Sequence, residues 1–136
     1  MAYVQFMQKK RMKCIHGQLT TAQVKANSRK GTIILPDETG RKITVWDGWL
    51  RSDGNASGAT AVVVTDNAAT PIVAFAMAVG GLTAATVARV GVATHYTGTT
   101  IGQPLTGGKG LRIGCTVADL ATTTVLDYCI FYTVES

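Results

Sequence analysis

The chain has 136 residues, of which 46% are hydrophobic and only 15% are charged, and its formal net charge is +5. This length fits one domain with a core of its own, so folding requires neither a disulfide framework nor a structural metal. The charged fraction lies well below the roughly 25% of an average globular protein. We therefore expect a molecule that hides surface against a partner or a second copy as well as in its own core.

The sequence contains no segment that resembles a membrane span or a secretion signal. The longest apolar run, residues 71–82, includes two glycines and is shorter than the ~20 apolar residues that a spanning helix needs. The basic residues near the N-terminus are not followed by the apolar stretch of a signal peptide. We expect synthesis in a host cytoplasm and no membrane partner.

Positive charge is concentrated in residues 1–31, which contain seven lysines and arginines and no acidic residue. We predict a basic N-terminal arm over 1–31 that precedes a body over 32–136. Such an arm is either a solvated tail or a docking element for an acidic protein surface or nucleic acid. Nucleic acid is disfavoured because Tyr3 and Phe6 precede the charges instead of alternating with them. The candidate docking residues are Lys9, Lys10, Arg11, Lys13, Lys25, Arg29 and Lys30.

From residue 32 onward, short runs rich in β-branched and aromatic residues alternate with turn residues. No part of this body has the period of an amphipathic helix. Clusters of Gly, Pro, Asn and Asp separate the runs, as in antiparallel β-proteins. We predict an all-β fold, an antiparallel β-sandwich that is jelly-roll-like. The predicted strands cover residues 32–35, 41–51, 59–65, 71–79, 86–95, 111–117 and 123–134.

The strand predicted at residues 71–79 is apolar on both faces. Bulky residues occupy its odd positions, and Ala74, Ala76 and Ala78 occupy even ones. A strand with one face in water would show polar residues in alternation. We expect the bulky face to fill the core and the alanines to form a subunit interface.

Three further residues are interface candidates. Trp46 and Trp49 are three positions apart on a predicted strand, so we expect them on opposite faces, one in the core and one at an interface. Asp127 lies between apolar neighbours and needs a partner if it is buried, for which Arg89 and Arg112 are candidates. We expect Trp46, Asp127 and Arg112 at the subunit interface.

The sequence offers no convincing catalytic constellation. Cys14 and His16 supply two metal ligands, whereas a structural zinc site has four. His95 and Asp127 lack the Gly-x-Ser-x-Gly element of a serine hydrolase. The glycine-rich residues 102–110 depart from a phosphate-binding loop and precede a strand. The three cysteines are odd in number and widely spaced, which argues against a disulfide framework. We expect no enzyme and no cofactor.

Three segments carry a family resemblance: WDGWLR at 46–51, ATAVVVTD at 59–66 and VLDYCIFYTV at 125–134. With the loop at 52–58, they resemble small virion proteins of tailed bacteriophages, of the capsid decoration or head-fibre type, over about residues 31–136. The resemblance implies a jelly-roll-like sandwich, commonly a homotrimer, that sits on a capsid and reinforces it. It also implies a place in the virion, with the major capsid protein or another virion protein as partner.

Three functional hypotheses follow. The first is a structural virion protein whose copies pack through the alanine or aromatic strand faces while the arm docks on the shell. The second is a receptor- or carbohydrate-binding fibre or tail module that uses the loops at 52–58 and 97–110. The third is a nucleic-acid-binding protein that uses the basic arm.

Overall fold

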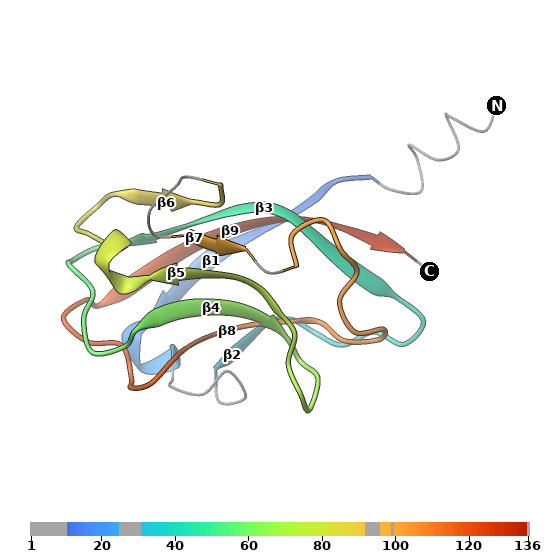
Figure 1. The fold of residues 1–136 in the computed structure, drawn as a ribbon, viewed down its shortest axis with the longest axis horizontal. Helices are drawn as coiled ribbons and strands as arrows, with labels where there is room; N and C mark the ends of the chain where they lie inside the picture. The colour runs from blue at the N-terminus through green and yellow to red at the C-terminus, as the bar shows by residue number, and fades with distance from the viewer. Residues whose placement is uncertain (1–10, 25–30, 92–95, 99, 136) are drawn as a thin grey trace.

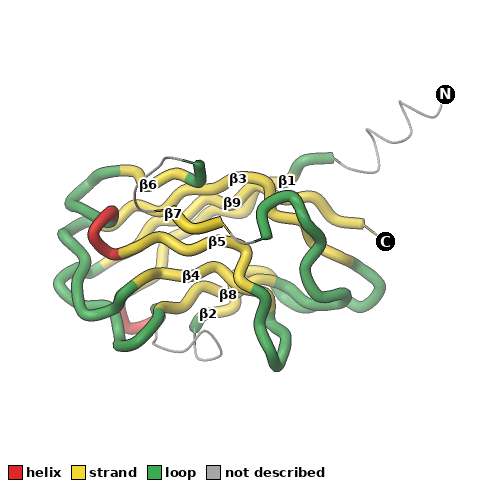
Figure 2. The backbone as a smooth tube through the Cα atoms, in the orientation of Figure 1, coloured by secondary structure: helices red, strands yellow, loops and turns green. Residues whose placement is uncertain are grey.

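The structure is a computed structural model that describes residues 11–24, 31–91, 96–98 and 100–135. Figure 1 and Figure 2 show two layers of strands packed against each other. Both sheets are antiparallel, and they enclose one continuous apolar core. The predicted all-β sandwich is confirmed.

The sheets have four and five strands in the described part of the chain. The order in the first sheet is β1 (Lys13–Thr20), β9 (Val125–Glu135), β3 (Lys42–Ser52) and β6 (Val87–Arg89). The order in the second sheet is β2 (Thr32–Leu35), β8 (Leu111–Cys115), β4 (Ala61–Asp66), β5 (Val73–Ala78) and β7 (Tyr96–Gly98). Two single turns of 3₁₀ helix follow β1 and β5, η1 (Thr21–Gln23) and η3 (Val79–Gly81).

The strand pairs are nested, as in one long hairpin that has been rolled up. The innermost pair is β4 with β5, and outside it β3 pairs with β6, β2 with β8, and β1 with β9. Two more pairs, β9 with β3 and β8 with β4, close the roll. The start of β1 and the end of β9 consequently lie side by side, with Lys13 opposite Tyr132.

The core lies between the two sheets. Phe75 and Met77 of β5 are almost completely buried, which confirms the expectation that the bulky face of residues 71–79 fills the core. They meet Leu50 of β3 and Ile130 of β9, which come from the other sheet and are also fully buried. Burying one such side chain contributes roughly 1.5–3 kcal/mol, so these positions contribute strongly to stability.

A β-bulge in β3 changes which side chains face the core. Trp46 is the extra residue between Val45 and Asp47, which pair with adjacent residues of β9. The buried positions therefore shift from odd numbers before the bulge, such as Val45, to even numbers after it, such as Leu50. Trp46 and Trp49 accordingly lie on the same outer face, and the prediction of opposite faces was wrong. A strict period of two cannot reveal an inserted residue.

A second bulge, in β5, removes one of the predicted interface residues. Ala74 is the extra residue between Val73 and Phe75, which pair with adjacent residues of β4. Ala74 and Phe75 are both 0% exposed as a result, so Ala74 belongs to the core and its assignment to a subunit interface was wrong. Ala76 and Ala78 remain half-buried on the outer face.

The predicted arm over residues 1–31 was too long, because residues 13–24 belong to the sandwich. β1 pairs with β9 along its whole length. Its residues Ile15 and Leu19 pack on the core, and Val24 beyond it is fully buried. An edge strand needs few apolar residues, because only one face and one neighbouring strand cover it. The polar, basic composition of this segment therefore did not indicate β1. Lys13 is therefore a strand residue, and Arg11 lies two positions before it. The remaining arm candidates lie outside the described residues: Lys9, Lys10, Lys25, Arg29 and Lys30.

Asp53 connects the loop after β3 to the start of β9. Its carboxylate accepts hydrogen bonds from the backbone N–H groups of Thr124 (2.9 Å) and Val125 (3.1 Å). It also accepts hydrogen bonds from the hydroxyls of Thr123 and Thr124. These donors, the Thr123 hydroxyl first among them, hold the pKa of Asp53 well below its usual range.

This lowered pKa predicts an acid-sensitive loop connection. Protonation of Asp53 is easier in the unfolded chain, so its stabilising contribution is present above its ordinary pKa of 3.8 and is lost as the pH falls below that value. We expect Asp53→Asn to lower Tm at about pH 7, and the difference from wild type to narrow on acidification. Thermal unfolding followed by circular dichroism at several pH values tests this. A difference that stayed constant below the ordinary pKa would contradict it.

Candidate functional site

The outer face of the first sheet carries aromatic residues beside paired polar ones. Trp46 is 44% exposed, and its indole N–H donates a 2.8 Å hydrogen bond to the hydroxyl of Thr133. The ring lies against Gly102, where a Cβ would come within 3.3 Å of the indole. Trp46 is therefore held in a fixed position while much of its ring faces solvent, which fits its predicted interface role.

The predicted ionic partners of Asp127 were wrong. The side chain of Gln18 on β1 donates a 2.7 Å hydrogen bond to Asp127. Arg89 instead binds Asp47 at 2.8 Å and holds the pKa of that carboxyl below its usual value. Arg112 lies on β8, in the other sheet. The contact between Asp47 and Arg89 depends on the register between β3 and β6, which sequence spacing does not show.

A shallow hollow of about 440 Å³ lies on the same outer face. Cys129 has a small side chain and is flanked by Trp49 on β3 and His16 on β1, its cross-strand neighbours. Gln18 and Asp127 line the hollow from the next cross-strand pair. An aromatic ring thus stands beside groups that donate and accept hydrogen bonds.

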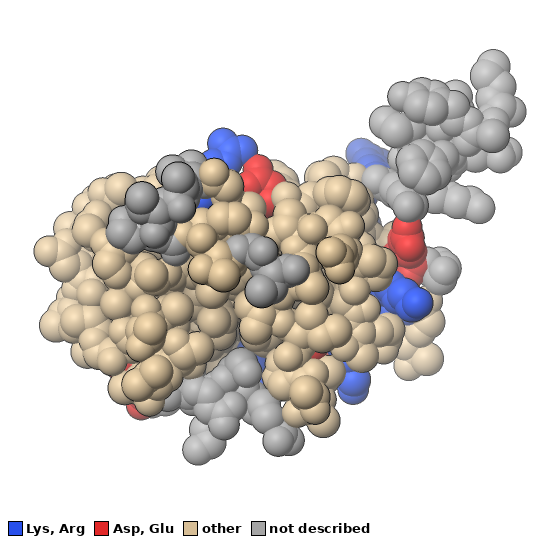
Figure 3. Space-filling view, viewed as in Figure 1, with Lys and Arg blue, Asp and Glu red and all other residues tan. Residues whose placement is uncertain are grey.

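The second sheet presents a different outer face, which we call the small-residue face and define by Ala61, Val63, Ala76, Ala78 and Gly114. Val63 pairs with Ala76 on one side and Gly114 on the other, while the flanking positions of β4 face the core. Figure 3 shows no charged side chain over β4 and β5. Val63 and Gly114, in the middle of this face, are buried in the single chain, whereas Ala61, Ala76 and Ala78 are half-buried.

The interface candidates divide between these two faces. Ala76 and Ala78 belong to the small-residue face, and Arg112 lies on the same side, since it pairs with Thr65 next to Val63. Trp46 and Asp127 lie on the outer face of the first sheet. The candidates therefore do not form one patch.

Charged residues gather at the end of the sandwich where β1 begins and β9 ends, as the view in Figure 3 indicates. A pocket of about 230 Å³ opens there between the two sheets. Its walls are apolar, with Ile43, Tyr132 and Val134 from the first sheet and Leu35 from the second. Its charged lining residues are Lys13, Glu38, Arg41 and Lys109.

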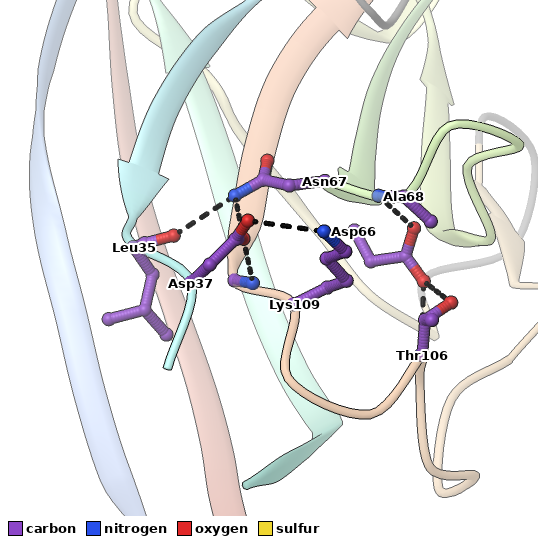
Figure 4. A network of polar contacts seen from close by, with 8 residues as sticks. Leu35, Asp37, Asp66, Asn67, Ala68, Thr106 and Lys109 are labelled. Carbon is purple, nitrogen blue, oxygen red and sulfur yellow. Dashed lines mark hydrogen bonds and ion pairs between the residues drawn. The ribbon is translucent and has the colours of Figure 1, made fainter. Parts of the chain in front are cut away.

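The same end contains a network of polar contacts that joins three loops (Figure 4). Asp37 accepts a 2.9 Å hydrogen bond from the side chain of Asn67 and a 2.8 Å bond from the backbone of Gly110. Lys109 lies 3.5 Å from the same carboxylate. The loops that follow β2, β4 and β7 are therefore held together.

Asp66, at the end of β4, forms a second, buried set of contacts beside this network (Figure 4). It is 0% exposed and accepts hydrogen bonds from the backbone N–H groups of Ala68 (3.1 Å), Ile72 (3.0 Å) and Thr106 (3.1 Å). The Thr106 hydroxyl donates a further bond of 2.6 Å. The sequence analysis did not single out Asp66 as a structural carboxylate. An aspartate that ends a strongly apolar strand is the signal that could have indicated a structural carboxylate.

The described residues contain no group of three or more His, Cys, Asp or Glu side chains that could hold a metal ion. Among the helices in the described part of the chain, none is long and apolar enough to cross a membrane. His95, considered for a catalytic triad, lies outside the described residues. His16 is exposed on β1.

Comparison with known proteins found no matching family model, no matching curated protein and no matching solved structure. The functional argument therefore rests on the surfaces of this chain.

The burial of Asp66 predicts a large effect of its removal. Asp66→Ala leaves several buried donors without an acceptor and should lower the free energy of unfolding by about 3 kcal/mol. Thr106→Val removes one donor and should cost about 1 kcal/mol. Glu38→Ala breaks only the exposed ion pair with Arg41 and should cost less than about 0.5 kcal/mol. Urea denaturation measures all three, and equal losses for Asp66→Ala and Glu38→Ala would refute the assignment.

Proposed function

We propose that this chain is a structural virion protein, a capsid decoration subunit of a tailed bacteriophage that assembles as a homo-oligomer and binds the phage head. The observation that carries the proposal is the small-residue face. Its residues are small and uncharged, so a second copy can approach Ala76 and Ala78 closely, with Arg112 of β8 at the edge of the contact. Ala76 and Ala78 lie in it and are half-buried in a single chain.

The nested strand pairs support a jelly-roll-like reading of the sandwich. Jelly rolls occur in viral capsid proteins and in lectins, among others. A fold alone does not define a function. The strand order is therefore consistent with a capsid protein and with a lectin, and it does not distinguish between them. The resemblance of residues 46–51, 59–66 and 125–134 to capsid decoration proteins favours the first.

The proposed assembly is a closed homotrimer, as the resemblance implies. In such a ring each copy would bury the small-residue face against a second, different patch of its neighbour. Arg11 and Lys13 lie at the charged end of the sandwich, where the described part of the chain begins. In the proposal, this shortened basic arm docks on an acidic surface of the major capsid protein or another virion protein. Several copies on one lattice would bind more tightly than one, by multivalency.

The first test is the native mass of the purified protein, measured by light scattering over a range of concentrations. We expect a stable multiple of the 14.3 kDa chain for the wild type and a monomer for Ala76→Arg, because the arginine places a long charged side chain in the small-residue face. Val87→Arg is the control, since Val87 is 52% exposed on β6 in the other sheet. A wild-type monomer, or an Ala76→Arg oligomer, would rule out this face as the interface.

The arm is tested separately by co-sedimentation with heads of the parent virus at physiological salt. The triple variant Lys9→Glu, Lys10→Glu and Arg11→Glu should keep the wild-type mass but lose at least about tenfold in affinity for heads, since opposite charges attract over about 8 Å at this salt. Unchanged head binding would contradict a docking role. Binding of wild type to DNA with a strong salt dependence would favour the nucleic-acid hypothesis instead.

A carbohydrate-binding module is the second candidate, and the hollow beside Trp49 favours it. A sugar ring can pack on an aromatic face while carboxylate and amide groups bind its hydroxyls, and Asp127 and Gln18 stand in position to do so. A glycan array probed with wild type and with Trp49→Ala distinguishes this candidate. Sugar binding by wild type that is lost in the variant would support it.

A further inference from the structure

Two cysteines from opposite ends of the chain meet on the outer face of the first sheet. The sulfur atoms of Cys14 on β1 and Cys129 on β9 are 3.1 Å apart. In the strand register, Cys14 is opposite Phe131 and Cys129 is opposite His16, so the cysteines are diagonal neighbours on one face. A disulfide has an S–S distance of about 2.05 Å, so the sulfur atoms need to approach by only about 1 Å.

The two thiols differ in accessibility. Cys14 is exposed, whereas Cys129 is only 7% exposed. Burial, together with the hydrogen bond to Cys14, raises the pKa of Cys129 to about 12. An external reagent therefore reaches the sulfur of Cys14 first, and Cys129 lies in place to react with whatever forms there.

The third cysteine is separate from this pair. Cys115 points into the core from β8, where its thiol contacts the carbonyl oxygens of Val24 (3.4 Å) and Ala118 (3.3 Å). Cys14 and Cys129 do not belong to any metal-binding group of three ligands among the described residues. The geometry therefore favours bond formation between these two sulfur atoms over metal binding.

We propose that Cys14 and Cys129 are a disulfide-forming pair that a small-molecule disulfide such as oxidised glutathione closes, fastening β1 to β9. The Cys14 sulfur attacks one glutathione sulfur, loses its proton and releases one glutathione thiol. The Cys129 thiol then loses its proton, and its sulfur attacks the Cys14 sulfur of this mixed disulfide. The bond between Cys14 and glutathione breaks, and the leaving glutathione sulfur takes up a proton to become the second glutathione thiol. Two cysteine thiols are oxidised and one oxidised glutathione is reduced to two thiols, so atoms and electrons balance.

The bond would fasten an edge strand of the first sheet. β1 is an edge strand that pairs only with β9 in its sheet, and the two cysteines are 115 positions apart in the chain. A crosslink over so long a loop restricts the unfolded chain strongly. Both thiols stay reduced in a cytoplasm and become oxidisable outside the cell, so the bond would form after synthesis and folding. This inference does not depend on the function proposed above.

The test uses the full chain, purified with a reductant and then equilibrated with oxidised glutathione. Free thiols, counted with a chromogenic disulfide reagent in denaturant, should fall from the three of the sequence to one. Peptide mapping should find Cys14 joined to Cys129, and non-reducing electrophoresis should show a single chain. The Tm of the oxidised form should be about 5–10 °C above that of the reduced form. This shift is what a crosslink over a loop of this length gives after part of its stabilisation is lost to strain in the folded state.

Matched variants identify the pair. Cys115→Ser should still lose both of its remaining thiols and show the same shift in Tm. Cys14→Ser, a change at an exposed position, should form no intramolecular bond and show no shift. Retention of all three thiols, a lasting glutathione adduct on Cys14, or crosslinked dimers in place of the internal bond would each overturn the proposal.

Discussion

The pairing of β9 with two neighbours is the constraint on which the rest of the structure depends. This strand of eleven residues pairs with β1 on one side and β3 on the other over nearly its full length. It thereby joins the start of the described chain to its end and closes the roll of nested hairpins. The inward residues of β9, among them Leu126 and Ile130, are fully buried and form one wall of the core. Strand pairs so distant in sequence make the sandwich one cooperative unit.

The chain has few charged residues, but three of its carboxylates hold loops in place. Asp53 joins the loop after β3 to the start of β9. Asp66 and Asp37 hold together the loops that follow β2, β4 and β7. Each of these side chains accepts backbone N–H groups that a loop would otherwise leave unpaired. The charged residues therefore secure the ends of the sandwich, and the broad surface over β4 and β5 is left without charge.

The fold class could be predicted from the sequence because alternation and turn residues are local signals. The predicted body contains the strands that became β2 to β5, β8 and β9, and the bulky side of β5 lies in the core as expected. The failures have two physical causes. Bulges at Trp46 and Ala74 each insert one residue, which reverses the facing of the residues beyond it. β1 was concealed because an edge strand is stabilised mainly by backbone pairing, which composition does not report.

The candidate site was less predictable than the fold. The prediction correctly assigned the small residues Ala76 and Ala78 to the outer face of β5. The same argument failed for Ala74, which is in the core. The partners of Asp127 and Arg89 depend on the register between distant strands, which no spacing in the sequence encodes. The same holds for Cys14 and Cys129, whose proximity arises only when β1 pairs with β9.

The side-by-side position of the start of β1 and the end of β9 has a mechanical consequence. A load that pulls these two ends apart acts across the ladder between Lys13 and Tyr132, and it opens the strand pairs one after another. Such unzipping resists force far less than shearing, in which all the hydrogen bonds of a ladder are loaded together. The sandwich would therefore be weakest to tension between its own two ends, and any anchoring that holds both ends to the same surface would protect it.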